Sequence, residues 1–187
     1  MYVEDSVLVQ KALLDVSEFA PLVERYEKKL DSYLRSIIFS SKEDREDILQ
    51  EIFIAVYRFL NTYDTKYSFS TWIYRIAHNK AVSFLRKHGT RISSEYVAQS
   101  EDEDVVENMV SDEDIEKNVE YLLSLEWVKS KLELLSPQDR AILLLRYCEQ
   151  KEYSEISAIL RIPEGTVASL IHRAKSKLKK LVVHDKT

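Results

Sequence analysis

Residues 152–181, EYSEISAILRIPEGTVASLIHRAKSKLKKL, contain two helical patterns separated by a short turn. The first pattern is a short helix around residues 156–160, and the second is a long basic helix that begins at Glu164. Between them, Arg161, Ile162 and Pro163 form a turn, because proline lacks the backbone donor that a continuing helix needs. This spacing predicts a helix-turn-helix.

The same stretch separates into a packing side and a polar side. The packing side contains Ile156, Ile159, Leu160, Ile162, Val167, Leu170, Ile171 and Leu178. The polar residues left available to a DNA duplex are Thr166, Ser169, His172, Arg173, Lys175 and Lys177. From residue 161 to the end, seven basic residues oppose two acidic ones, which favours DNA binding over a packed helical pair with a solvated basic tail.

Upstream of this stretch, the helical period continues. One apolar stripe is formed by Leu125, Val128, Leu132 and Leu135. Residues 135–149, LSPQDRAILLLRYCE, then carry start signals of a helix. Ser136 can cap it, Pro137 suits its first position, and Asp139 lies near the positive end of its dipole.

The composition of the 187 residues restricts the fold class. The chain is 45% apolar, and it has two glycines and three prolines, too few for the tight turns of a many-stranded fold. Apolar residues recur at three-and-four spacing along most of the chain, which predicts an all-α protein. The shortage of glycine also argues against a glycine-rich loop that cradles phosphates, and therefore against nucleotide-dependent enzymes.

The net charge of −5 hides an uneven distribution. Eleven acidic residues lie in residues 92–120, where Lys117 is the one basic residue. The remainder of the chain has 26 basic and 21 acidic residues, so it is net positive. We predict that residues 92–120 form a flexible acidic linker between two small helical domains, residues 1–91 and 121–187.

Residues 1–66 contain three helical patterns. Residues 4–15 form the first, and residues 17–39 form the second, in which Ser17 can cap and Pro21 falls in the first turn. The third begins near Ser41, where Asp44 completes a pattern like a capping box. Its apolar stripe is Ile48, Leu49, Ile52, Phe53, Val56, Tyr57 and Leu60. Its opposite face presents Asp47, Gln50, Glu51 and Ile54.

Residues 67–89, YSFSTWIYRIAHNKAVSFLRKHG, predict a fourth helix with two different faces, which Gly89 can terminate. At about 100° per residue, Phe69, Ile73, Ile76 and Phe84 fall on a packing side. Arg75, Asn79, Val82 and Arg86 fall on another side. Residues 64–91 contain six basic residues and one acidic residue, interleaved with aromatic ones. Single-stranded DNA binding requires basic groups that contact the backbone and aromatic faces that stack on unstacked bases. The alternative is an ordinary amphipathic helix, whose charges are only solvated.

These motifs resemble conserved regions two and four of bacterial sigma factors, in the minimal two-domain form called extracytoplasmic-function sigma factors. The resemblance rests on DREDILQEIFIAVYRFL, on FSTWIYRIAHNKAVSFLRK, and on the stretch from LSPQDR to the basic helix. It covers about three quarters of the chain. It implies a subunit that binds core RNA polymerase, recognises two promoter elements and helps open the duplex.

Carried over by position, the resemblance assigns site residues in the first domain. Those that match the polymerase-binding motif are Asp47, Gln50, Glu51 and Phe53. The resemblance also implies residues that bind the minus-ten promoter element, both as duplex and as melted single strand. These residues are Lys66, Tyr67, Phe69, Trp72, Arg75, Asn79 and Arg86. The resemblance implies a loop that receives a flipped base and that contains Lys66, Tyr67 and Phe69. Stacking of the base on an aromatic ring would offset the free-energy cost of taking the base out of the duplex. The spacing of Trp72 with Ile73 and Ile76 fits core packing equally well.

In the second domain, the resemblance assigns the minus-thirty-five element to the basic helix. The residues that match are Thr166, Ala168, Ser169, His172, Arg173 and Lys175. The sequence departs from the family at Arg161, where glycine is usual, and at Ala168 and Leu170, where basic residues are usual. An arginine in a left-handed turn is mildly strained, and two missing cations remove phosphate contacts. In the family the interdomain segment threads the RNA path of the polymerase, although a flexible tether explains residues 92–120 equally well.

Other chemistry is poorly supported by the sequence. His78, His88, His172 and His184 lack the spacing of a zinc site, so we predict histidines on the surface or in a groove. Cys148 has no cysteine to pair with, and it lies beside apolar residues, so we predict a small core residue. We therefore predict no enzyme activity, no cofactor and no metal.

Two other functions remain open at this point. A stand-alone helix-turn-helix regulator would use the first domain as a sensor or dimerisation unit, and a decoy protein would sequester a partner. The N-terminus is acidic, and the longest apolar run, AILLL, is too short for a bilayer, so we expect a cytoplasmic protein without membrane insertion. Under the sigma-factor interpretation, its partners are core RNA polymerase and promoter DNA, and an anti-sigma factor is a further candidate.

Overall fold

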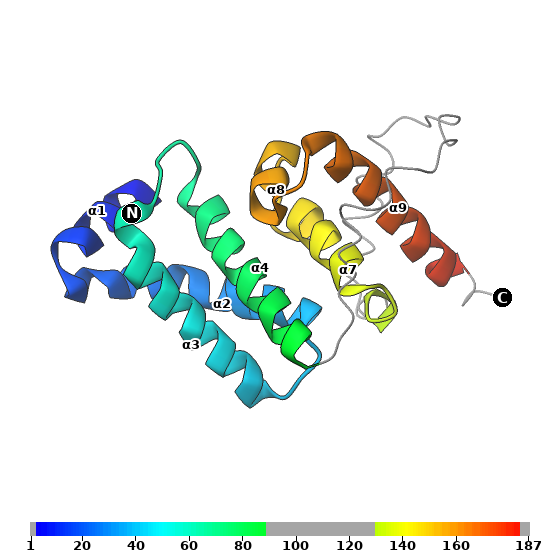
Figure 1. The fold of residues 1–187 in the computed structure, drawn as a ribbon, viewed down its shortest axis with the longest axis horizontal. Helices are drawn as coiled ribbons and strands as arrows, with labels where there is room; N and C mark the ends of the chain where they lie inside the picture. The colour runs from blue at the N-terminus through cyan, green and yellow to red at the C-terminus, as the bar shows by residue number, and fades with distance from the viewer. Residues whose placement is uncertain (1–2, 89–129, 184–187) are drawn as a thin grey trace. The chain divides into compact units, whose positions relative to one another are not determined.

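A computed structural model describes residues 3–88 and 130–183, and these residues are helical without a strand (Figure 1). This confirms the all-α prediction for the described part of the chain. The chain divides into two compact units, and α8 is described below with the second unit, to which most of its residues belong. The predicted acidic linker, residues 92–120, lies outside the described residues, as do Gly89 and His184.

The first unit contains α1 to α4 and two short 3₁₀ turns. Their bounds are α1 Asp5–Leu14, a turn at Val16–Phe19, α2 Ala20–Ile37, α3 Lys42–Phe59, a turn at Leu60–Thr62, and α4 Phe69–Lys87. Helices α2, α3 and α4 pack against one another, as Figure 1 shows. All four helices predicted for residues 1–89 are therefore present.

The apolar stripes of α2 and α3 form much of this core. The buried residues of α2 are Leu22, Tyr26, Leu30, Tyr33, Leu34 and Ile37, and those of α3 are Ile48, Leu49, Ile52 and Val56. Removing such side chains from water stabilises the unit by about 1.5–3 kcal/mol for each large one. Two members of the predicted α3 stripe differ, because Phe53 is half-buried and Tyr57 is exposed.

The helix starts test the predicted caps. Ser41 caps α3 through a 3.1 Å bond from the Asp44 amide, as predicted, and Ser68 caps α4 through a 3.1 Å bond from the Thr71 amide. The prediction for Ser17 is wrong. Residues Val16–Phe19 form a 3₁₀ turn in which the Asp15 carboxylate accepts the Ser17 amide at 2.9 Å, so α2 begins later, at Ala20.

The buried side of α4 is wider than the sequence predicted. Ile76 and Phe84 are half-buried, whereas Tyr74, Ala77, Ala81 and Leu85 are buried. His78 is also buried, with 6% of its surface exposed, and its Nδ1 lies 3.1 Å from the Tyr33 hydroxyl. The prediction of a surface or groove histidine is therefore wrong for His78. Burial lowers the pKa of His78 from 6.5 to about 4.

The second unit contains α7 Pro137–Leu143, a π-helical continuation Leu144–Cys148, α8 Tyr153–Leu160 and α9 Glu164–Val183. Ser136 caps α7 through a 3.2 Å bond from the Asp139 amide, with Pro137 in the first turn, as predicted. Leu132 and Leu135 are buried, whereas Leu125 and Val128 lie outside the described residues. Within the described residues, no helix is long and apolar enough to cross a membrane.

The π-helical turn corrects the prediction for Cys148. The Glu149 amide donates to the Leu144 carbonyl at 2.9 Å, five residues back instead of four. This wider turn changes the direction of the side chains that follow it. Cys148 is exposed, so it is no core residue.

Helices α8 and α9 have the predicted helix-turn-helix packing. All eight residues of the predicted packing side are buried: Ile156, Ile159, Leu160, Ile162, Val167, Leu170, Ile171 and Leu178. The predicted helix-turn-helix is therefore confirmed.

Candidate nucleic-acid interface

An exposed polar stripe runs along α3. Asp47, Gln50 and Glu51 are exposed, as the sequence predicted, and their spacing places them on one side of the helix. Ile54 continues this stripe with 52% of its surface exposed, although the sequence assigned it no role. Phe53 is half-buried and offers only part of its ring.

Helix α4 borders this stripe through an ion pair. The Lys80 ammonium lies 2.9 Å from the Glu51 carboxylate. The hydrogen bond and charge of Lys80, with a smaller contribution from Lys87, lower the pKa of Glu51. The α3 stripe therefore presents an ionised carboxylate beside an amide and an exposed apolar side chain.

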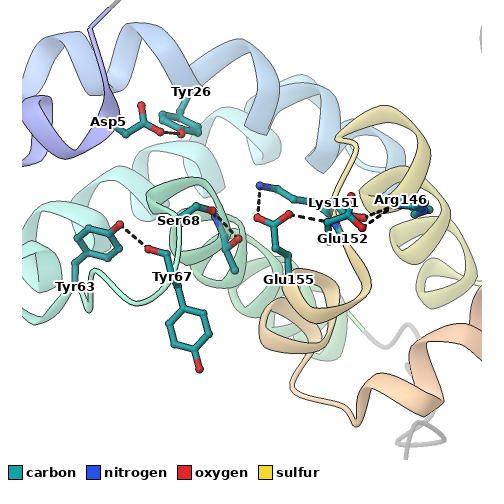
Figure 2. Close-up of polar contacts among 10 residues, drawn as sticks. Asp5, Tyr26, Tyr63, Tyr67, Ser68, Arg146, Lys151, Glu152 and Glu155 are labelled. Carbon is teal, nitrogen blue, oxygen red and sulfur yellow. Dashed lines mark hydrogen bonds and ion pairs between the residues drawn. The ribbon is translucent and has the colours of Figure 1, made fainter.

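The loop of residues 63–68, which joins the Leu60–Thr62 turn to α4, is fixed by its own hydrogen bonds. The Asp64 side chain accepts the Lys66 amide at 3.0 Å, and the Asp64 carbonyl accepts the Tyr67 amide at 3.2 Å. The Tyr63 hydroxyl donates to the Tyr67 carbonyl at 2.7 Å. Figure 2 shows this bond and the Tyr67 ring directed away from it.

Accessibility differs sharply among the residues predicted for this loop. Lys66 is exposed, and Tyr67 has 48% of its surface exposed, so both can meet a ligand. Phe69 has 2% and Trp72 has 6% of its surface exposed. Contact of a base with Phe69 or Trp72 is therefore not supported by this structure, and the core alternative for Trp72 is favoured.

Phe69 and Trp72 belong to a cluster of aromatic rings beneath the loop. The Phe69 ring lies 5.5 Å from the Tyr26 ring and 5.5 Å from the Tyr63 ring, in edge-to-face arrangements. The Trp72 ring lies 5.6 Å from Phe69 and 5.5 Å from Tyr63. Such ring pairs contribute about 0.5–1.5 kcal/mol each beyond their buried area, so the cluster is a firm support for the loop.

Helix α4 presents cationic and amide groups along one side. Asn79 and Arg86 are exposed, and Arg75 and Val82 are half-buried, as expected for the side that faces away from the core. Their spacing of three or four residues places them in one row. This row can contact a sugar-phosphate backbone, whereas the exposed Tyr67 ring can stack on a base.

The second unit offers the polar sides of α9. Ala168, Ser169 and His172 are exposed, and Thr166, Arg173 and Lys175 are half-buried. The Ser169 hydroxyl donates to the Thr166 carbonyl at 3.0 Å, and the Lys175 ammonium lies 5.8 Å from the centre of the Tyr147 ring. All six predicted residues therefore lie on the same helix with some surface accessible.

One cation of α9 has a partner in α7. The Lys177 ammonium lies 2.7 Å from the Asp139 carboxylate, which also accepts the Ser136 hydroxyl at 2.8 Å. The sequence placed Lys177 among the residues available to DNA. Its ion pair with Asp139 makes it a weaker candidate for DNA contact than the sequence alone suggested.

Two protein families match separate parts of the chain. Sigma-70 region 2 matches residues 22–91, and Sigma-70 region 4 matches residues 125–178. The ECF RNA polymerase sigma factor SigW of Bacillus subtilis is 31% identical over 169 residues, covering 89% of each chain. The ECF RNA polymerase sigma-E factor of Escherichia coli is 35% identical over 178 residues, covering 91% of this chain and 90% of that protein. This chain belongs to the ECF sigma factors.

Solved structures share the fold of this sigma factor. CnrH, solved in complex with the cytosolic domain of CnrY, aligns with a TM-score of 0.67 at 24% identity, covering 97% of this chain and 98% of CnrH. The sigma factor RpoE of Bartonella quintana, solved with the anti-sigma factor NepR, aligns with a TM-score of 0.63 at 20% identity. That alignment covers 88% of this chain and 96% of RpoE.

The turn of the helix-turn-helix in this sigma factor contains a left-handed residue. Arg161 has φ 58° and ψ 46°, the region that favours glycine. The Ser157 hydroxyl donates to the Ile162 carbonyl at 2.6 Å and ties the end of α8 to the turn. The strain expected at Arg161 is therefore present, and it lies in the turn between α8 and α9.

The described part of the sigma factor shows no arrangement suited to a metal. Within residues 3–88 and 130–183, no three His, Cys, Asp or Glu side chains are grouped so that they could hold an ion. The groups that the candidate sites of the two units offer are carboxylates, cations, amides, hydroxyls and the exposed Tyr67 ring. These are groups that bind other macromolecules.

Proposed function

We propose that this sigma factor binds core RNA polymerase through the exposed stripe of α3 and recognises two promoter elements with its two units. ECF sigma factors are the promoter-specificity subunits of RNA polymerase, and this chain is one of them. Asp47, Gln50 and Glu51, with Ile54 beside them, contact the polymerase.

The loop of residues 63–68 receives a base from the melted minus-ten element. The observation that carries this role is the exposed Tyr67 ring, held on an ordered loop above buried rings. Stacking of a base on such a ring is worth about 1–3 kcal/mol, which offsets part of the cost of extruding the base. Lys66 and the row of Arg75, Asn79 and Arg86 contact the backbone, whereas Phe69 and Trp72 act as support.

The second unit reads the minus-thirty-five element as duplex DNA. Helix α9 enters the major groove, as the second helix of a helix-turn-helix does. Thr166, Ala168, Ser169, His172 and Arg173 meet the groove, and Lys175 contacts a phosphate. Because the exposed Ala168 stands where the family usually has a cation, this contact depends on fewer phosphates and has a shallower salt dependence.

The remaining roles follow from the family. We propose that the protein has no catalytic centre of its own, since the polymerase forms the phosphodiester bonds, and that it acts in the cytoplasm with the polymerase. CnrH and Bartonella quintana RpoE were solved with the cytosolic domain of CnrY and with the anti-sigma factor NepR. We therefore propose an anti-sigma factor as a further partner.

A double substitution on α3 tests polymerase binding. Gln50→Ala/Glu51→Lys removes an amide and reverses a charge in the proposed contact, so affinity for core polymerase is expected to fall by about 30-fold or more, the size of a hot-spot loss. The matched control is Gln10→Ala/Glu24→Lys, the same two changes at exposed positions of α1 and α2. Quantitative pull-down measures the affinity, and circular dichroism checks the helix content.

The control fixes how this result is interpreted. Loss in the α3 variant with retention in the control supports the docking stripe. If both variants retain core polymerase equally well, the α3 stripe is not the docking site, and a stand-alone regulator is favoured.

A further inference from the structure

Helix α1 lies outside the Sigma-70 region 2 match, which begins at residue 22, but it is tied to the loop that carries Tyr67. Asp5 is the first residue of α1, and its carboxylate lies 2.5 Å from the Arg25 guanidinium. The same carboxylate accepts the Tyr26 hydroxyl, as Figure 2 shows. One α1 side chain therefore fixes two neighbouring residues of α2.

Tyr26 connects this contact to the aromatic cluster. Its side chain is buried, and its ring lies edge-to-face with the Phe69 ring at 5.5 Å. Phe69 in turn lies 5.5 Å from Tyr63, whose hydroxyl donates to the Tyr67 carbonyl. A continuous series of contacts thus runs from Asp5 to the backbone of the exposed tyrosine.

We propose that Asp5 is a positioning residue for the loop of residues 63–68, which it holds through Tyr26, Phe69 and Tyr63. The Asp5 carboxylate gives the buried Tyr26 hydroxyl a hydrogen-bond acceptor. A buried hydroxyl without an acceptor lowers the free energy of unfolding. The N-terminal helix therefore sets the shape of the base-binding loop. The consequence for DNA rests on the role proposed above for Tyr67.

Packing and charge both support this linkage. Protein interiors are packed as densely as organic crystals, so a displaced ring shifts the rings in contact with it. Burial, followed by the negative charges of Asp5 and Asp64, raises the pKa of Tyr63. A tyrosine with an ordinary pKa of about 10 is already protonated at neutral pH, so the Tyr63 hydroxyl is the donor to the Tyr67 carbonyl. The effect of Asp5 on the pKa of Tyr63 shows that the two side chains lie near each other.

Two substitutions break the linkage at different points. Tyr26→Phe removes the hydroxyl but keeps the ring and leaves α1 intact, and Asp5→Ala removes the carboxylate. The matched control is Glu18→Ala, which deletes another acidic side chain of the N-terminal segment, one that pairs with Lys11 at 3.9 Å. All variants are made in the full chain.

Amide hydrogen exchange of Lys66 and Tyr67 reports the loop without DNA. Both amides donate to Asp64, so loosening of the loop exposes them to solvent. Local opening is expected to accelerate their exchange about 3- to 10-fold in Asp5→Ala, and in the same direction but less in Tyr26→Phe. Exchange in α3 stays as in the parent protein. A merely structural role would accelerate exchange in α3 and in the loop together.

Binding of a short random-sequence single-stranded DNA to the complex with core polymerase gives the functional readout. Asp5→Ala is expected to weaken this binding about 3- to 10-fold, since stacking tolerates any base, while polymerase affinity is unchanged. In a Tyr67→Ala background, Asp5→Ala has no further effect. The Glu18→Ala control matches the parent protein in each measurement.

The measurements distinguish a failure of the role proposed for Asp5 from a failure of the DNA role proposed for the loop. If loop exchange in both Asp5→Ala and Tyr26→Phe equals that of Glu18→Ala, or rises only together with α3, Asp5 does not position the loop. If Tyr67→Ala binds single-stranded DNA as well as the parent, the DNA role of the loop fails, and loop exchange still decides the role of Asp5.

Discussion

The two units place their proposed DNA contacts in different ways. In the first unit, the exposed Tyr67 ring stands on a loop supported by the buried rings of Tyr26, Phe69 and Trp72 and by the half-buried ring of Tyr63. In the second unit, the proposed contacts lie along the polar side of α9, and the turn before that helix contains the left-handed residue Arg161. Residues that never touch DNA should therefore affect binding more in the first unit than in the second.

The largest effect is expected for the support of the loop. Phe69→Ala empties a buried site and should lower the free energy of unfolding of the first unit by about 3–5 kcal/mol. Tyr67→Ala changes an exposed residue and should alter it by less than about 0.5 kcal/mol. Denaturant unfolding followed by Trp72 fluorescence, in a Trp127→Phe background, separates the two. Similar small losses for both variants would show that the cluster does not support the loop.

Acid should weaken the first unit through His78. Because its pKa falls from 6.5 to about 4 on folding, the unfolded chain binds a proton in this interval while the folded chain does not. The free energy of unfolding should drop by about 3 kcal/mol as pH falls from 6.5 to 4, and this contribution should be constant above that interval. Unfolding titrations at several pH values measure the slope.

Substitution identifies the group that causes this slope. His78→Gln should flatten the pH dependence, whereas His88→Gln, at an exposed position after α4, should leave it as in the parent. An unchanged slope in His78→Gln would assign the acid sensitivity to other groups.

DNA binding should separate the two units by the step each affects. Arg173→Ala should weaken the closed complex by about 1–3 kcal/mol if the guanidinium reads a base in the major groove. Tyr67→Ala should leave the closed complex intact and impair melting, because stacking is gained only after a base leaves the duplex. Permanganate reactivity of promoter thymines, with polymerase bound, measures opening.

A template with a pre-melted bubble sharpens this contrast. It should restore transcription to Tyr67→Ala more than to Arg173→Ala, because the bubble removes the step that needs the loop. Wild-type thymine reactivity in Tyr67→Ala on ordinary duplex would argue against a melting role for the loop.

The smallest effect is expected at the turn of the second unit. Arg161→Gly should relieve the strain of a left-handed backbone conformation, but glycine also loses more conformational entropy on folding. The net stabilisation of α8 and α9 should therefore be no more than about 1 kcal/mol. Gln150→Gly is the matched control, because it makes the same kind of change at a positive φ of 49° but outside the turn that joins α8 to α9. Hydrogen exchange of α8 amides measures the gain. A loss of protection in Arg161→Gly would mean that contacts of the arginine outweigh the strain.

The sequence by itself determined the features that depend on neighbouring residues. The helical period predicted α1 to α4, the capping patterns located Ser41 and Ser136, and the Pro163 turn with its flanking apolar residues predicted the helix-turn-helix. These signals depend on hydrogen bonds and side-chain spacing within one or two turns, so they can be read without a tertiary structure.

Tertiary structure decided which side chains became buried and which contacts formed between distant residues. Tyr33 and His78, 45 residues apart, meet in the core, and Asp5 meets Tyr26 across 21 residues. The helical period correctly placed Phe69 on a packing side, whereas the family resemblance implied that it lies in the base-binding loop, and packing of four rings buried it. The sequence placed Cys148 in the core, but a π-helical turn exposed it. Helical period assigns a residue to a side of its own helix, whereas the elements that cover that side are chosen only when the helices pack.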